Sequence, residues 1–186
     1  MAKKSKRVAA IGAVILTFLA GCAYQRGTVE SGTVLQEGRH AAILPLVNLT
    51  TYPHAGRIVG DLLTTEMYAS SGFRIMESTE MLERLKGEEE DLERVLDRTV
   101  AQRIGARLGV DTVVFGSVTE YRYKRGLDED PVVGINIRML DVKSGNILAV
   151  GSRSETGGCF WFCEDSLNRL AQKVCHDLVR RMVKVN

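Results

Sequence analysis

The stretch Leu108-Gly-Val-Asp-Thr-Val-Val-Phe-Gly-Ser-Val118 decides the fold of this chain. It follows apolar residues at four-residue intervals, which predict one face of a helix; they are Leu92, Leu96, Val100, Ile104 and Leu108. Gly109 then ends the helix, and the run 113–115 predicts the core of a buried strand within residues 111–125. Gly116, in the middle of that strand, indicates a place where another backbone approaches closely.

The segments on either side also alternate between strand and helix patterns. Upstream, the apolar run 40–48 predicts a first strand, in which Pro45 is confined to an edge, a bulge or the strand's end. Downstream, alternation at 133–139 predicts a half-buried strand with antiparallel pairing. The other predicted elements are a helix at 55–69, a strand at 73–76, a helix that Ser78 or Thr79 caps and Gly87 ends, a turn at 143–146, a strand at 147–153 and a helix at 164–183.

The predicted elements follow the order β-α-β-α-α-β-β-β-α. This order indicates an α/β fold, a single domain in which helices pack on a mixed β-sheet. It excludes an all-β sandwich and a helical bundle. About 165 residues follow position 21, and a chain of that length buries roughly two-thirds of its unfolded surface as one domain.

The first 22 residues indicate the cellular compartment. Lys3, Lys4, Lys6 and Arg7 precede an apolar run, and Leu19-Ala-Gly-Cys22 ends it. This arrangement resembles a bacterial lipoprotein processing signal, which implies removal of residues 1–21 and lipidation of Cys22. An uncleaved anchor, or an ordinary signal peptide with a chance cysteine, is the alternative. Ala23, where an aspartate would favour retention at the inner membrane, implies by the same resemblance a lipid-anchored protein on the periplasmic face of the outer membrane.

The mature chain consists of two segments, residues 22–38 and residues 39–186. The first segment is rich in Gly, Thr, Ser, Gln and Glu without periodicity, which predicts a short flexible tether that keeps the domain 39–186 near the membrane. The leader holds four of the 25 basic residues and no acidic residue, so the mature chain has 21 basic against 23 acidic residues and a net charge of −2. Without a basic excess, we expect no nucleic-acid partner.

The segment Gly157-Gly-Cys-Phe-Trp-Phe-Cys163 joins the last predicted strand to the last predicted helix. In an oxidising compartment, Cys159 and Cys163 are candidates for a disulfide that closes a small loop. The aromatic residues Phe160, Trp161 and Phe162 are candidates for binding a protein partner or the lipid interface. The alternative is that these rings cover the end of the sheet.

Other groups that could support chemistry do not form a recognisable site. His40, His54 and His176 lie on separate predicted elements, and no nucleotide-binding, zinc-protease or serine-hydrolase motif is present. A zinc site that combines the cysteines with His176 is disfavoured, because Cys175 falls on the apolar face of the last helix, where a buried apolar thiol is expected. The acidic run 88–91 is expected to be a solvated helix start. We therefore predict no metal, no cofactor and no catalytic residues.

Four segments together are similar to the family of the curli-secretion lipoprotein CsgG. They are Ala42-Ile-Leu-Pro-Leu-Val-Asn48, Gly72-Phe-Arg-Ile-Met76, Leu108 to Val118, and Leu140-Asp-Val-Lys-Ser-Gly-Asn-Ile-Leu148. That family also includes outer-membrane lipoproteins that activate peptidoglycan synthases, and it resembles the N-terminal domain of the Tol translocation protein. The resemblance covers about residues 39–184 and implies envelope assembly or transport without catalysis.

The resemblance favours a non-catalytic scaffold or accessory subunit in envelope assembly or export. Its expected partners are the membrane, through the lipid, other envelope proteins, and further copies of the chain in a homo-oligomer. A secretion-channel component and a regulator of a peptidoglycan synthase are the alternatives. The hairpin at 121–131 is highly charged around its turn, which disfavours a pore made by this chain alone, and the short tether disfavours a far-reaching activator. With the loop 158–163, this hairpin is expected to form the exposed contact surface.

Overall fold

The computed structural model describes residues 29–31, 38–70, 72–87, 95–124, 129–158 and 166–183. The strands in this part of the chain are β1 (Val29–Ser31), β2 (His40–Ile43), β3 (Val47–Asn48), β4 (Arg74–Ile75), β5 (Thr112–Tyr123), β6 (Pro131–Asp141) and β7 (Ile147–Thr156). The helices are α2 (Ala55–Ser70), α3 (Ser78–Arg84), α5 (Arg98–Leu108) and α6 (Leu167–Val183). The expected class, a single α/β domain with a mixed sheet packed by helices, is confirmed.

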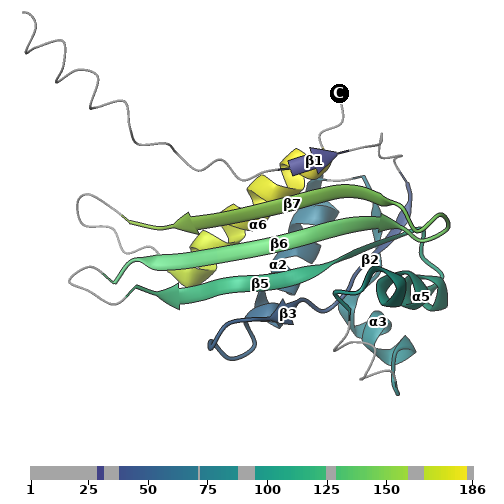
Figure 1. The fold of residues 1–186 in the computed structure, drawn as a ribbon, viewed down its shortest axis with the longest axis horizontal. Coiled ribbons are helices and arrows are strands. Elements are labelled where there is room, and N and C mark those ends of the chain that lie inside the picture. The colour runs from purple at the N-terminus through teal and green to yellow at the C-terminus, as the bar shows by residue number, and fades with distance from the viewer. Residues whose placement is uncertain are drawn as a thin grey trace, which may run out of the picture.

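One mixed sheet organises the described residues (Figure 1). Its strand order is β1-β7-β6-β5-β2-β4, and β3 pairs with β5 beyond the end of β2. The three long strands β5, β6 and β7 pair antiparallel, as the sequence predicted, whereas β2, β3 and β4 pair parallel to their neighbours. The parallel pairs follow from helical crossovers, because a helix carries the chain back before the next strand begins.

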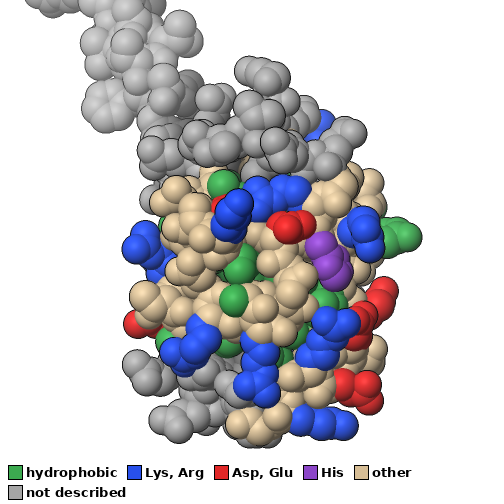
Figure 2. All heavy atoms as spheres, turned by 90° about the vertical axis from the view of Figure 1, so that its right-hand side faces the viewer, with side chains coloured by type: hydrophobic (Ala, Val, Ile, Leu, Met, Phe, Trp, Pro, Cys, Tyr) green, Lys and Arg blue, Asp and Glu red, His purple; other side chains and the backbone are tan. Residues whose placement is uncertain are grey.

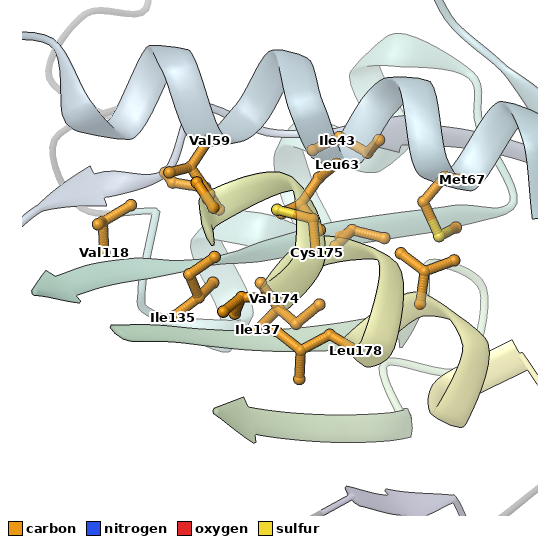
Figure 3. Close-up of a cluster of buried hydrophobic side chains, with 14 of the residues drawn as sticks. Ile43, Val59, Leu63, Met67, Val118, Ile135, Ile137, Val174, Cys175 and Leu178 are labelled. Carbon is orange, nitrogen blue, oxygen red and sulfur yellow. The ribbon is translucent and has the colours of Figure 1, made fainter. Parts of the chain in front are cut away.

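Helices α2 and α6 cover one face of this sheet and enclose the larger core (Figure 3). Val118, Ile135 and Ile137 point from the sheet toward the helices, where Val59 and Leu63 of α2 meet Val174, Cys175 and Leu178 of α6. The alternation of apolar residues along β6 places every second side chain in this core. The apolar face predicted for the last helix, α6, is confirmed, since Leu167, Leu170, Ala171, Val174, Leu178 and Met182 are all buried.

Helices α3 and α5 lie on the other face and form a second core with β2 and β5. Val113 and Phe115 of β5 point into it, and they meet Ile104 and Leu108 of α5. Because β5 alternates, its residues Val114 and Val118 belong to the first core, so one strand connects both. Gly109 ends α5 with a φ of 69°, as predicted.

The first predicted strand, 40–48, is divided into β2 and β3. Pro45 lies in the break, where a residue without a backbone N–H cannot extend the ladder. The fold also contains β1 inside residues 22–38, the segment expected to be a tether, where it pairs antiparallel with β7. Val29 lies opposite Gly151 and Ser31 opposite Ala149. The long edge strand β7 offers unpaired backbone groups, and three tether residues satisfy some of them.

Three expected details on the helices differ in the structure. Leu92 and the acidic run 88–91, where a helix start was expected, lie outside the described residues. The helix that carries Val100, Ile104 and Leu108 begins at Arg98, because the Asp97 side chain caps it by accepting hydrogen bonds from the backbone N–H groups of Thr99 and Val100. Neither Ser78 nor Thr79 caps α3, since Ser78 is already its first residue. The apolar residues Met81, Leu82 and Leu85 predict the inner face of that helix, but Leu82 is 49% exposed.

Candidate interaction surface

The tips of the long strands meet at one end of the sheet, which we call the hairpin end. Here β5 ends, β6 begins, β7 ends and α6 begins (Figure 1). The backbone N–H of Lys124 donates to the carbonyl of Asp130 (2.8 Å), and the N–H of Gly157 donates to that of Pro131 (2.8 Å). These bonds hold the three strand ends level with one another.

Tyr121 is the buried centre of the hairpin end. Its hydroxyl donates to Oδ1 of Asn168 in the first turn of α6, and its ring lies 4.9 Å from the ring of Tyr52. Burial raises the pKa of Tyr121 to about 12, and the neighbouring Tyr52 and Tyr123 add to the shift. The side chain therefore remains a neutral hydrogen-bond donor that links β5 to α6.

The loop between β3 and α2 supplies Tyr52 and is held by Asn48. The Asn48 side-chain amide donates to the carbonyl of Tyr52 (2.9 Å), and its oxygen accepts from the backbone N–H of Thr50 (3.0 Å). The N–H of Leu49 donates to the carbonyl of Val118 on β5 (2.9 Å). These contacts fix the loop against the sheet, so its side chains have a defined direction.

Three large side chains at the hairpin end face the solvent. Leu49 is 59% exposed, Tyr52 41% and Tyr123 44%. The Tyr123 hydroxyl accepts a hydrogen bond from the backbone N–H of Leu167 (3.4 Å), which places this ring at the start of α6. We call Leu49, Tyr52 and Tyr123 the exposed aromatic patch. Residues of this kind are enriched at binding surfaces and at membrane interfaces.

The charged hairpin at 121–131 is exposed only in part. Tyr121 and Pro131, at its two ends, are buried, whereas Arg122, Lys124 and Glu129 are exposed. Its turn, 125–128, lies outside the described residues.

A buried ion cluster joins β7 to α6 behind the hairpin end. The Arg153 side chain is 4% exposed, and its guanidinium contacts the carboxylates of Glu155 (2.7 Å) and Asp177 (2.9 Å). Lys173 of α6 pairs with the same Glu155. Although partial burial raises the pKa of Glu155, the hydrogen bonds from Lys173 and Arg153 outweigh this effect and lower it. The cluster fixes α6 relative to the sheet.

The cysteine and histidine of α6 occupy different environments. Cys175 is fully buried in the first core, and burial raises the pKa of its thiol to about 12. This confirms the expected buried apolar thiol. Nδ1 of His176 lies 2.8 Å from a carboxylate oxygen of Glu66 on α2, and its side chain is 45% exposed. The two residues therefore do not converge on one site.

The predicted site residues near the N-terminus and in the aromatic loop lie outside the described residues. These are Cys22, Cys159, Phe160, Trp161, Phe162 and Cys163. The disulfide and the aromatic binding site remain predictions. Their flanking residues are placed, because Gly158 lies beside Asp130 of the hairpin and Ser166 immediately precedes α6, so the loop leaves and returns at the hairpin end.

Sequence reasoning did not identify Tyr52, Tyr121 and Arg153. The position of Arg153 could have been recognised. Because strand side chains alternate between the two faces, Arg153 lies on the same buried face of β7 as Ala149 and Gly151. A charged residue on a buried face requires oppositely charged partners. No comparable signal pairs Tyr52 with Tyr121, which lie far apart in the sequence.

Within the described ranges, no group of three or more His, Cys, Asp or Glu residues is placed to hold a metal ion. Among the helices of those ranges, none is both long and apolar enough to cross a membrane. An open depression of about 460 Å³ lies between α2 and α6, where Asp61 and Arg169 are among its lining residues.

The fold and this surface define a class of protein: a mixed α/β domain with an exposed aromatic patch at one end of its sheet. The family profile of the curli production assembly/transport component CsgG matches residues 36–157, about two-thirds of the chain. The chain belongs to this family, as the sequence resemblance predicted. No curated protein matches the chain.

Several solved structures share this fold. The PelC dodecamer from Paraburkholderia phytofirmans is 23% identical, with a TM-score of 0.63 over 87% of this chain and 100% of that one. Lipoprotein GNA1162 from Neisseria meningitidis is 21% identical, with a TM-score of 0.56 over 76% and 99%. The LpoB C-terminal domain from Salmonella enterica is 12% identical, with a TM-score of 0.51 over 66% and 86%. At these identities the similarity establishes the fold alone.

Proposed function

We propose that this protein is an outer-membrane lipoprotein, lipidated at Cys22, whose periplasmic domain is a non-catalytic accessory subunit in envelope assembly or export. The observation that carries the proposal is the family match over residues 36–157, because that family is described by assembly and transport. The leader and Cys22 supply the anchor, and the domain supplies binding surfaces.

The proposed working form is a homo-oligomer. PelC has the same fold, its whole chain aligns with 87% of this chain, and it forms a dodecamer. The domain presents an open depression between α2 and α6, and such a surface provides area for subunit contacts. The second candidate, a ring-forming secretion-channel component, is favoured by the transport function in the family's description.

The native mass of the lipidated protein tests the oligomer. We would extract the full protein in mild detergent and measure its mass by size exclusion with light scattering, beside a form that lacks residues 1–22. A discrete multimer is expected, and a multimer that requires the lipid would favour a ring-forming complex. A monomer in both forms would contradict the oligomer and favour an adaptor.

Trp161→Ala tests whether the aromatic loop binds partners. We expect an unchanged circular dichroism spectrum and a loss of crosslinked envelope proteins, because large aromatic anchors dominate protein interfaces. Tyr68→Ala is the matched control, since Tyr68 is 74% exposed near the end of α2 that lies away from the hairpin end. Unchanged crosslinking, or an unfolded domain, would contradict partner binding and show that Trp161 covers the end of the sheet.

A further inference from the structure

The register of β1 restricts the orientation of the domain relative to the proposed lipid anchor at Cys22. β1 runs antiparallel to β7, and Val29 lies opposite Gly151. The N-terminal end of β1 therefore points in the direction in which β7 runs, toward Thr156 and the hairpin end (Figure 1). Only six residues, 23–28, separate Cys22 from β1. The effective tether is much shorter than the segment 22–38 suggests.

The reach of this short tether favours one end of the molecule. Five residues separate Gly151 from the end of β7, which is about 17 Å of strand. Seven residues from Val29 back to Cys22 span at most about 25 Å, a reach that exceeds the distance to the hairpin end by several ångströms. A chain that reversed its direction would spend about two residues on the turn, and the rest would reach only about the level of Ile147, at the start of β7.

The chemistry of the two ends agrees with this geometry. The hairpin end carries the exposed aromatic patch, Leu49, Tyr52 and Tyr123. It also exposes Arg122, Lys124 and Glu129, whose charged groups can stay in the hydrated headgroup layer beside the patch. Tyrosine fits a membrane interface because its ring is apolar and its hydroxyl remains hydrated. The opposite end shows Lys and Arg side chains spread over its surface, with Asp, Glu and some hydrophobic side chains between them (Figure 2). Such an end is better hydrated than buried in lipid.

We propose that the hairpin end faces the membrane and that the exposed aromatic patch contacts the lipid interface, with β1 as the element that orients the domain. This inference rests on the proposed lipidation of Cys22. One acyl anchor site per chain leaves a domain free to rotate, whereas a second contact through the patch fixes its direction. The opposite end, which includes the turn between β6 and β7, then faces away from the membrane.

The solvent accessibility of native tyrosines provides the test, because Tyr52 and Tyr123 lie in the patch and Tyr68 lies far from it as a control. The full lipidated protein would be placed in vesicles of phosphatidylethanolamine and phosphatidylglycerol, and hydroxyl-radical labelling would be read residue by residue by mass spectrometry. The comparison is the same lipidated chain with twelve Gly and Ser residues inserted after Ala23, which frees the domain from the bilayer. Tyr68 reports the opposite end of α2 in both samples.

We expect labelling of Tyr52 and Tyr123 in the native protein to fall below half of that in the insertion variant, because the lipid interface excludes the reagent, with Tyr68 unchanged. Equal labelling of Tyr52 in both proteins would overturn the inference. This outcome includes the case in which a second copy of the chain covers the patch, because that copy would protect Tyr52 in both proteins. Protection of Tyr68 alone would show the reverse orientation. The mass of the Cys22 peptide is read in the same experiment, so a missing lipid contradicts the proposed function separately.

Discussion

Burial limits the reactivity and the movement of two side chains in this domain. Cys175 is surrounded by the core between α2 and α6, and Arg153 is held by two carboxylates. In both cases burial determines what the side chain can do: the thiol is kept neutral, and the guanidinium is held in one position by its carboxylate partners.

Cys175 is predicted to resist alkylation in the folded protein. Burial, with a smaller contribution from Glu66, raises the pKa of its thiol from 9.0 to about 12, so the reactive thiolate is scarce at pH 8. Iodoacetamide labelling followed by peptide mass analysis would show Cys175 modified only after denaturation. Rapid labelling in the native state would contradict the buried position.

The same shift predicts a dependence of stability on alkaline pH. The folded-state pKa is raised, so the contribution of the protonated thiol is present below pH 9 and is lost as pH rises toward about 12. Cys175→Ala should show a weaker alkaline decrease in the free energy of unfolding than the native chain, measured by urea titration at several pH values. An identical decrease in both proteins would assign it to other groups.

Asp141 gives the opposite dependence, at acid pH. Partial burial raises the pKa of Asp141, but hydrogen bonds from Arg39 and from the N–H and hydroxyl of Ser144 outweigh this and lower it from 3.8 to about 2. Its stabilising contribution is therefore present above pH 4 and is lost as pH falls toward 2. We expect Asp141→Asn to cost about 1–3 kcal/mol at pH 7.

Acid titrations of unfolding would measure this effect, with Asp61→Asn as the control because Asp61 is exposed on α2. The difference between native protein and Asp141→Asn should shrink as pH falls below 4. A difference that stays constant down to pH 2 would show that the carboxylate is not what the variant removes.

At the scale of elements, close backbone approach decides the pairing of β5 with β6. A Cβ atom built on Gly116 would lie 2.0 Å from the carbonyl oxygen of Asn136 on β6. No side chain can relieve this contact, because the obstructing atom belongs to the backbone of the neighbouring strand. The glycine was recognisable from the sequence as a point of close approach, and this expectation is confirmed.

Gly116→Ala is therefore predicted to destabilise the domain by about 2–4 kcal/mol, since the strands must separate locally. The matched control is Gly60→Ala on α2, where a Cβ meets nothing within 4 Å and a helix gains up to about 1 kcal/mol from alanine. Urea denaturation compares the two. A loss of stability in the control, or none in Gly116→Ala, would contradict the assigned packing.

At the scale of the whole molecule, two cores share one sheet. Residues of β5 alternate between the core under α2 and α6 and the core under α3 and α5. Neither core can lose its packing without disturbing this strand, so the domain is expected to unfold in one cooperative transition.

This cooperativity is tested with one truncation in each core. Leu170→Ala opens the first core and Ile104→Ala the second, and each should cost about 2–5 kcal/mol. Far-ultraviolet circular dichroism and the reactivity of the Cys175 thiol, which lies in the first core, should report coincident transitions in both variants. Separate transitions for the two probes would show that the cores unfold independently.

Most elements could be predicted from the sequence because their patterns are local. The alternation along β6, the inward face of α6 and the Gly145 turn each depend on neighbours within a few residues, and each is confirmed. The start of α5 was missed because Leu92 and Leu96 continue the four-residue spacing, while the Asp97 cap decides where the helix begins. A local cap outweighs a longer apolar repeat.

The surface was less predictable, since it depends on residues that only the fold brings together. The sequence by itself determined the α/β class, the family resemblance and the expected lipid anchor, because these depend on composition, periodicity and short motifs. Tertiary structure alone decided that Tyr52 packs on Tyr121, that Arg153 lies between Glu155 and Asp177, and that β1 joins the edge of β7. The physical reason is that strand register and helix docking are set by long-range burial, which no local pattern encodes.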